Sequence, residues 1–223
     1  MSSKNVEWEL ENLKDFAKKV LQPLKEVAFP VIVEATTGKK IIKIDLEKEE
    51  DKELIEGIKQ VAHKVSEKYY ENEELIGNRP NDVSEPLEQI FVDELINEGI
   101  EGKRLKRKGY PDLEIKDKKD RRTYIEIKVS RIENVEKGSP RNFYYKPSKK
   151  TKIKEDARHL LFGFVIKERI PKHWKILGWK LVDLAHLKVN FKPEFNADNK
   201  EIYKEEAIIA EEWMEKQGLE KFS

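Results

Sequence analysis

Two neighbouring segments, residues 110–116 and 123–130, constrain the fold of this chain more than any other feature of its sequence. Each segment alternates aliphatic side chains with charged ones. Because successive side chains of a strand point to opposite faces of a sheet, both segments are predicted to be strands with one apolar and one charged face. A turn at Lys118–Asp120 joins them as an antiparallel pair in which residue 112 lies opposite residue 126.

The charged face of this strand pair carries a candidate catalytic site. In the predicted register Asp112 and Glu126 are cross-strand neighbours, with β-carbons about 4.5–5.5 Å apart. Two carboxylates at that separation repel each other unless a cation lies between them, and Mg²⁺ prefers oxygen ligands. Lys128 shares their face, where an ammonium can orient a water nucleophile and stabilise charge on a phosphate. The pattern indicates a metal-assisted hydrolase; the alternative is an exposed hairpin with a solvated charged face.

The acid-x-lysine spacing is not specific by itself in a chain that is 40% charged. Glu114-Ile115-Lys116 and Asp117-Lys118-Lys119 fit it as well. The combination with a preceding Pro-Asp is more selective, because Pro111 is the only one of nine prolines that precedes an aspartate.

The composition excludes several classes of protein. No apolar run approaches the ~18–20 residues of a membrane-spanning helix, and the amino-terminal residues lack the apolar stretch of a signal peptide, so a cytoplasmic protein with no membrane partner is expected. With no cysteine, the chain cannot use thiol catalysis, cysteine–zinc sites or iron–sulfur clusters.

Charge is unevenly distributed along a chain whose net charge is only +1. Residues 99–122 hold ten basic and five acidic side chains, and residues 131–154 hold eight basic and two acidic ones. Such segments favour a surface that binds a polyanion, although a salt-bridged solvated surface would look the same.

Periodicity predicts the remaining elements. A β-hairpin is expected where Pro30–Val33 and Ile41–Ile44 flank Thr36-Thr37-Gly38-Lys39. The other predicted elements are helices at Val6–Leu21, Lys52–Tyr70, Ser84–Asn97, Lys152–Arg158 and Lys204–Lys216, and strands at Leu160–Ile166 and Trp174–Val182.

From residue 84 the order is helix, two strands, helix, two strands, with one more strand before Tyr110 left open. This order predicts an α/β (α+β) fold with a central mixed sheet flanked by helices. Two domains are expected: a mostly helical N-terminal extension with one hairpin over residues 1–77, and a core with a C-terminal helix over residues 78–223.

The Pro-Asp and Glu-x-Lys residues resemble the motif of the PD-(D/E)xK nuclease superfamily, with Asp112, Glu126 and Lys128 at the matching positions. Residues 79–83, 178–184, 187–189 and 194–199 also look similar to type II restriction endonucleases in particular. The resemblance implies a restriction-endonuclease-like core and Mg²⁺-dependent, sequence-specific hydrolysis of duplex DNA that leaves 5′-phosphates. Asp112, Glu126 and the backbone carbonyl of Ile127 would bind the metal, and Lys128 would align or activate the attacking water.

Members of this superfamily often add an acid from a preceding helix. The candidates are Glu85 and Glu88. Glu88 falls on the apolar face of the predicted helix, where a carboxylate needs a partner, and is expected to support the metal. Glu85 lies in the first helical turn, where the helix dipole stabilises an acid, and is expected to be structural.

The basic loop after the Lys128 strand is expected to contact DNA, because basic side chains position a protein on phosphates and Arg or Asn can read base edges. The predicted DNA-binding residues are Arg104, Arg107, Arg141, Asn142, Tyr144, Tyr145, Lys146, Lys149 and Lys150. Cutting both strands of a palindromic site favours a homodimer, and a cognate DNA methyltransferase is a possible partner in the cell. Two other functions remain open: a structure-selective repair or junction nuclease of the same fold, and a non-catalytic DNA-binding module.

Overall fold

A computed structural model describes residues 12–18, 25–106, 109–136, 143–148 and 150–191 of the chain. The chain divides into two compact units, Met1–Lys25 with Asn190–Ser223, and Glu26–Val189. In the first unit, residues 12–18 form a helix inside the predicted Val6–Leu21 segment. The predicted helix Lys204–Lys216 lies outside the described residues, and the domain boundary after residue 77 stays a prediction.

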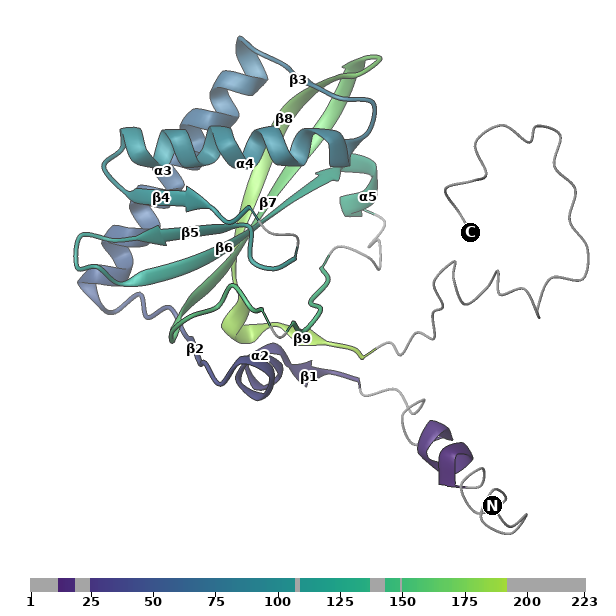
Figure 1. The fold of residues 1–223 in the computed structure, drawn as a ribbon. Coiled ribbons are helices and arrows are strands. Elements are labelled where there is room, and N and C mark those ends of the chain that lie inside the picture. The colour runs from purple at the N-terminus through teal and green to yellow at the C-terminus, as the bar shows by residue number, and fades with distance from the viewer. Residues whose placement is uncertain (1–11, 19–24, 107–108, 137–142, 149, 192–223) are drawn as a thin grey trace, which may run out of the picture. The chain divides into compact units, whose positions relative to one another are not determined.

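A seven-stranded mixed sheet forms the centre of the second unit (Figure 1). Its order is β3-β8-β7-β6-β5-β4, and β2 also pairs with β7. β7 runs parallel to β6 and β2, and the other pairs are antiparallel. The strands are β2 (Ile41–Ile42), β3 (Leu75–Ile76), β4 (Glu101–Arg104), β5 (Leu113–Lys116), β6 (Arg122–Arg131), β7 (Ala157–Ile170) and β8 (His173–Asp183). The predicted mixed sheet is confirmed, and β4 is the additional strand before Tyr110.

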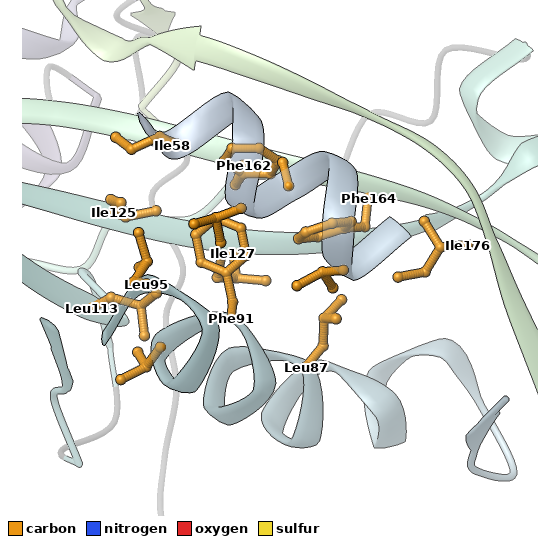
Figure 2. Close-up of a cluster of buried hydrophobic side chains, with 14 of the residues drawn as sticks. Ile58, Leu87, Phe91, Leu95, Leu113, Ile125, Ile127, Phe162, Phe164 and Ile176 are labelled. Atoms are coloured by element: carbon orange, nitrogen blue, oxygen red, sulfur yellow. The ribbon is translucent and has the colours of Figure 1, made fainter. Parts of the chain in front are cut away.

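Helices α3 (Glu49–Glu71) and α4 (Pro80–Asn97) cover one face of this sheet and bury the larger apolar cluster. Figure 2 shows Phe91 of α4 against Phe162 and Phe164 of β7, with Ile127 of β6 beside them. Both helices agree with the apolar periodicity of the sequence. In the part of the chain that the structure describes, no helix has the length and apolar content needed to cross a membrane.

A smaller apolar cluster lies on the other face of the sheet. It joins Phe29 and Val33 of α2 (Phe29–Thr37) to Tyr110, Tyr124 and other buried residues. β1 (Val27–Ala28) pairs antiparallel with β9 (Lys188–Val189). Leu184 of the short helix η1 (Leu184–His186) and Val189 of β9 belong to the same cluster. The remaining element, α5 (Ile132–Glu136), lies within the connection from β6 to the parallel strand β7.

The hairpin predicted around Gly38 is wrong. Residues 29–37 form α2, and only Ile41–Ile42 is a strand, paired parallel with β7. The β-branched residues suggested a strand, but Pro30 stands in the first helical turn and Gly38 closes the helix in the left-handed conformation, with φ +68°. Phe29 and Val33, four residues apart, supply the buried face of the helix.

The helix predicted at Lys152–Arg158 is also wrong, because this segment is irregular until β7 begins at Ala157. Its polar groups are bonded to distant residues instead. The Lys154 amide donates to the Tyr124 hydroxyl at 2.9 Å, and Asp156 accepts from the Lys40 amide at 2.8 Å. Ile153 is buried in the smaller cluster, so tertiary contacts outweigh helix propensity here.

Candidate functional site

The register of β5 and β6 is the predicted one. Leu113 pairs with Ile125, and Asp112 lies one residue before that pair, close enough to Glu126 for the two charges to interact. The Asp112 amide donates to the carbonyl of Ile125 at 3.1 Å. Asp112 Oδ2 accepts from the Ile127 amide at 2.9 Å, so the aspartate carboxylate is held against the β6 backbone.

Glu126 is a buried carboxylate with one unused oxygen. Its side chain is 5% exposed, and Lys128 Nζ donates to Oε1 at 2.5 Å. Among the described residues Oε2 has no hydrogen-bond partner. Burial and the charge of Asp112 together raise the pKa of Glu126 to about 7, against the opposing effect of Lys128. A buried acceptor with no partner, beside a second carboxylate, is a position that a cation would stabilise.

Of the two acids predicted from the preceding helix, Glu88 is the one that is largely buried and interacts electrostatically with Asp112. Its side chain is 16% exposed, whereas that of Glu85 is 78% exposed. Burial raises the pKa of Glu88, the charge of Asp112 adds to that rise, and an ion pair with Arg104 at 3.0 Å opposes it. Arg104 also pairs with Glu85, so its guanidinium bridges the two glutamates.

The residues present suit a hard divalent cation. Asp112, Glu126 and Glu88 offer carboxylate oxygens, the ligands that Mg²⁺ prefers. The N–H and C=O of one strand residue point to the same side of the strand. Because the Ile127 amide donates to Asp112, the Ile127 carbonyl also points toward the side on which Asp112 lies. No group of three or more His, Cys, Asp or Glu side chains that could hold an ion is formed within the described ranges, so a bound metal would need further ligands such as water.

Glu114, which fits the same acid-x-lysine pattern, has a different environment. Its side chain is also 5% exposed, but Lys103 and Arg122 neutralise it at 2.8 and 2.9 Å. Both oxygens of Glu114 are therefore paired with cations, whereas Glu126 keeps Oε2 without a partner among the described residues. The structure therefore distinguishes Glu126 from a neighbour that the sequence pattern does not separate.

The predicted DNA-contact residues are only partly described. Tyr144, Lys146 and Lys150 are exposed. Tyr145 instead packs edge-on against Phe29 and Tyr110 and hydrogen bonds to Thr36, so its ring supports the smaller cluster. The predicted contacts that lie outside the described residues are Arg107, Arg141, Asn142 and Lys149.

Lys152 is a residue of this site that the sequence did not reveal. Its ammonium donates to the carbonyls of Gly109 and Pro111 at 2.5 and 2.6 Å, directly before Asp112. Burial lowers its pKa, and the charges of Asp112, Glu126 and Glu88 oppose that effect. No spacing pattern links a lysine to a strand forty residues earlier, so only its place in the basic segment 131–154 pointed to the region.

Comparison with a family model and comparison with a curated protein point to the same family. The sequence matches the family model of the type II restriction enzyme MjaV family over residues 23–206. It is also 36% identical over 222 residues to the type II restriction enzyme MjaV of Methanocaldococcus jannaschii, covering 90% of this chain and 95% of that protein. The resemblance to type II restriction endonucleases is thereby confirmed. The chain, whose matched range includes both strands of the carboxylate pair and helix α4, belongs to the type II restriction enzyme MjaV family.

Proposed function

We propose that this chain is a Mg²⁺-dependent type II restriction enzyme that hydrolyses phosphodiester bonds at a specific sequence in duplex DNA. Type II restriction enzymes are sequence-specific DNA endonucleases, and the family match supports that activity. The observation that carries the metal assignment is the placement of Asp112 against the β6 backbone beside Glu126, whose buried Oε2 has no partner among the described residues.

Each residue of the site has a distinct part in the proposed chemistry. Asp112, Glu126, the Ile127 carbonyl and Glu88 would hold the ion, which when bound supplies Lewis-acid stabilisation of charge on the phosphate. Lys128, paired with Glu126, orients the attacking water and donates to a phosphate oxygen. Water forms a new bond to phosphorus, the bond to the 3′ oxygen breaks, and that oxygen takes a proton, which leaves a 5′-phosphate.

DNA and other proteins would be the partners of such an enzyme. Exposed Tyr144, Lys146 and Lys150 would contact DNA, together with the predicted residues outside the described ranges. A two-fold dimer would match the symmetry of a palindromic site and cut both strands. A DNA methyltransferase of the same specificity would protect host DNA in the cytoplasm, where the enzyme would act.

Digestion of a phage-sized duplex DNA tests the proposal. Incubation with MgCl₂ on the order of 10 mM, suited to a weakly held ion that retains waters, should give discrete bands, and EDTA should abolish them. The new ends should accept label from polynucleotide kinase only after phosphatase treatment, as 5′-phosphates require. A Mg²⁺-dependent smear would contradict sequence specificity, and cutting confined to branched DNA would favour a junction nuclease.

The Mg²⁺ requirement should depend on pH through Glu126. A carboxylate must lose its proton to bind a cation, and the pKa of Glu126 is raised to about 7 in the metal-free protein. Below pH 7 protons compete with the metal, so the Mg²⁺ concentration for half-maximal cleavage should rise up to about tenfold per unit of falling pH. It should level off above pH 7. A requirement that stays constant between pH 5.5 and 8 would contradict this role of Glu126.

Substitution of Glu88 and of Glu85 should have different effects on the rate of DNA cleavage. Glu88→Gln should slow cleavage about 10–100-fold, the usual effect of removing a group that supports a metal site. Glu85→Gln should stay within about twofold, because its side chain is 78% exposed. Both variants remove one partner of Arg104, so Glu85→Gln is the matched control, and single-turnover rates at several Mg²⁺ concentrations make the comparison. Equal losses in the two variants would assign the effect to Arg104 rather than to the metal.

A further inference from the structure

The turn that leads into Asp112 is held at Tyr110, which is buried and bonded to His159 at 2.6 Å, and at both of its ends by Lys152 from a distant part of the chain. Lys152 Nζ donates to the carbonyl of Gly109 at 2.5 Å and to that of Pro111 at 2.6 Å. An ammonium has three donors, and these carbonyls use two of them. The contact connects the loop before β7 to Pro111, 41 residues earlier and just before β5 begins.

The backbone of Asp112 and the backbone of the turn before it are held by different contacts. Asp112 itself is bonded to its neighbouring strands, through its amide to Ile125 and through its carbonyl to the Leu105 amide at 2.7 Å. Gly109, by contrast, has φ +92°, a conformation that residues other than glycine rarely adopt. Lys152 holds both ends of the Gly109–Pro111 turn at once.

The charge of Lys152 matches the charge of the site. Burial lowers the pKa of Lys152, and the charges of Asp112, Glu126 and Glu88 oppose that effect. Lys128 and Arg104 are the other cations paired with these acids, to Glu126 and Glu88 respectively. Arg104 also pairs with Glu85, so in the absence of a metal three cations lie among four carboxylates.

We propose that Lys152 is a positioning residue that fixes the Gly109–Pro111 turn, so that Asp112 is held ready to bind the divalent ion. This inference rests on the proposed function and deepens it, because it assigns to the metal site a residue outside the Asp112, Glu126 and Lys128 motif. Lys152 acts through the backbone carbonyls and does not touch the reacting atoms. The main effect of removing its side chain should therefore be weaker binding of the metal ion.

Titration of the full chain with Mn²⁺ alone, followed by the electron paramagnetic resonance signal of free Mn²⁺, tests this. Mn²⁺ is used because it accepts the same oxygen ligands as Mg²⁺. Lys152→Met should weaken Mn²⁺ binding and slow Mg²⁺-dependent cleavage, each about 10–100-fold, as expected for a partner that orients a ligand. Lys152→Arg should recover most of both, because it keeps the charge and the donors. Lys154→Met, which removes an exposed lysine from the same loop, should stay within about twofold.

The outcomes separate this inference from the proposed function. If the wild-type chain neither binds Mn²⁺ nor cuts, the proposed function fails. If the wild-type chain does both and Lys152→Met equals Lys154→Met, only the role of Lys152 is wrong. Tighter Mn²⁺ binding by Lys152→Met would also overturn the inference, since the ammonium would then be a competing cation. Weaker DNA binding by Lys152→Met in EDTA, with an unchanged affinity for Mn²⁺, would also overturn it. Thermal unfolding checks each variant, and Lys152→Gln, which keeps an N–H donor, serves if Lys152→Met does not fold.

Discussion

Replacing Asp112 by Asn should slow DNA cleavage by at least about two orders of magnitude while leaving DNA binding intact. The amide keeps the shape of the side chain and an oxygen that can accept from the Ile127 amide, but it loses the charge that faces Glu126. The expected loss in the cleavage rate is about 10²–10³-fold or more, the range for removing one electrostatic contact to a transition state. Lys128→Met should lose activity to a similar extent, because it removes the donor paired with Glu126.

The matched control for this prediction is Asp120→Asn. Asp120 lies in the exposed β5–β6 turn with φ +58°, a conformation that asparagine adopts readily, so the substitution should be nearly neutral. Single-turnover cleavage in saturating MgCl₂ gives the rates, and a gel-shift assay in EDTA gives the binding of each variant. Cleavage by Asp112→Asn within about threefold of the wild-type rate, far less than loss of a transition-state contact would cause, would remove Asp112 from the site.

Phe91→Ala should destabilise the fold strongly, because it opens the centre of the larger apolar cluster. Phe91 is completely buried on α4, with its ring centroid 4.9 Å from that of Phe162 and 5.8 Å from that of Phe164. Truncating a buried phenylalanine removes apolar contacts and leaves a cavity, which costs about 3–5 kcal/mol of the free energy of unfolding. Figure 2 shows the packing that would be lost.

Urea denaturation measures this effect, with Ile96→Ala as the control on the same helix. Ile96 is 53% exposed, so its truncation should change the free energy of unfolding by no more than about 0.5 kcal/mol. Because Phe91 stands one helical turn after Glu88, loosening α4 should also reduce Mg²⁺-dependent cleavage. A destabilisation below about 1 kcal/mol for Phe91→Ala would contradict the assignment of α4 to the sheet core.

The strand pair was predictable because its signals are local. Alternation predicted the two faces of β5 and β6, and the short turn between them predicted the register from Leu113 to Lys116, which brings Asp112 close to Glu126. Periodicity over many residues likewise predicted α3 and α4. These elements place the three motif residues, and they needed no knowledge of distant contacts.

Other features were not predictable because they depend on distant contacts. Pro30 and Gly38 turn a β-branched segment into α2, whose Phe29 is buried beneath Tyr110 and Tyr145. Residues 152–158 avoid a helix because their polar groups bond to other segments. Lys152 reaches the site through backbone carbonyls, which leave no trace in the side-chain pattern.

The central claim is that Asp112 and Glu126 together bind a divalent cation, and anomalous scattering from a crystal soaked in Mn²⁺ tests it most directly. A peak should lie within bonding distance of one oxygen of Asp112 and of Glu126 Oε2, with the Ile127 carbonyl beside it. Crystals of Asp112→Asn under the same conditions should lose the peak. Mn²⁺ bound elsewhere at saturating concentration, with both carboxylates unliganded, would contradict the claim.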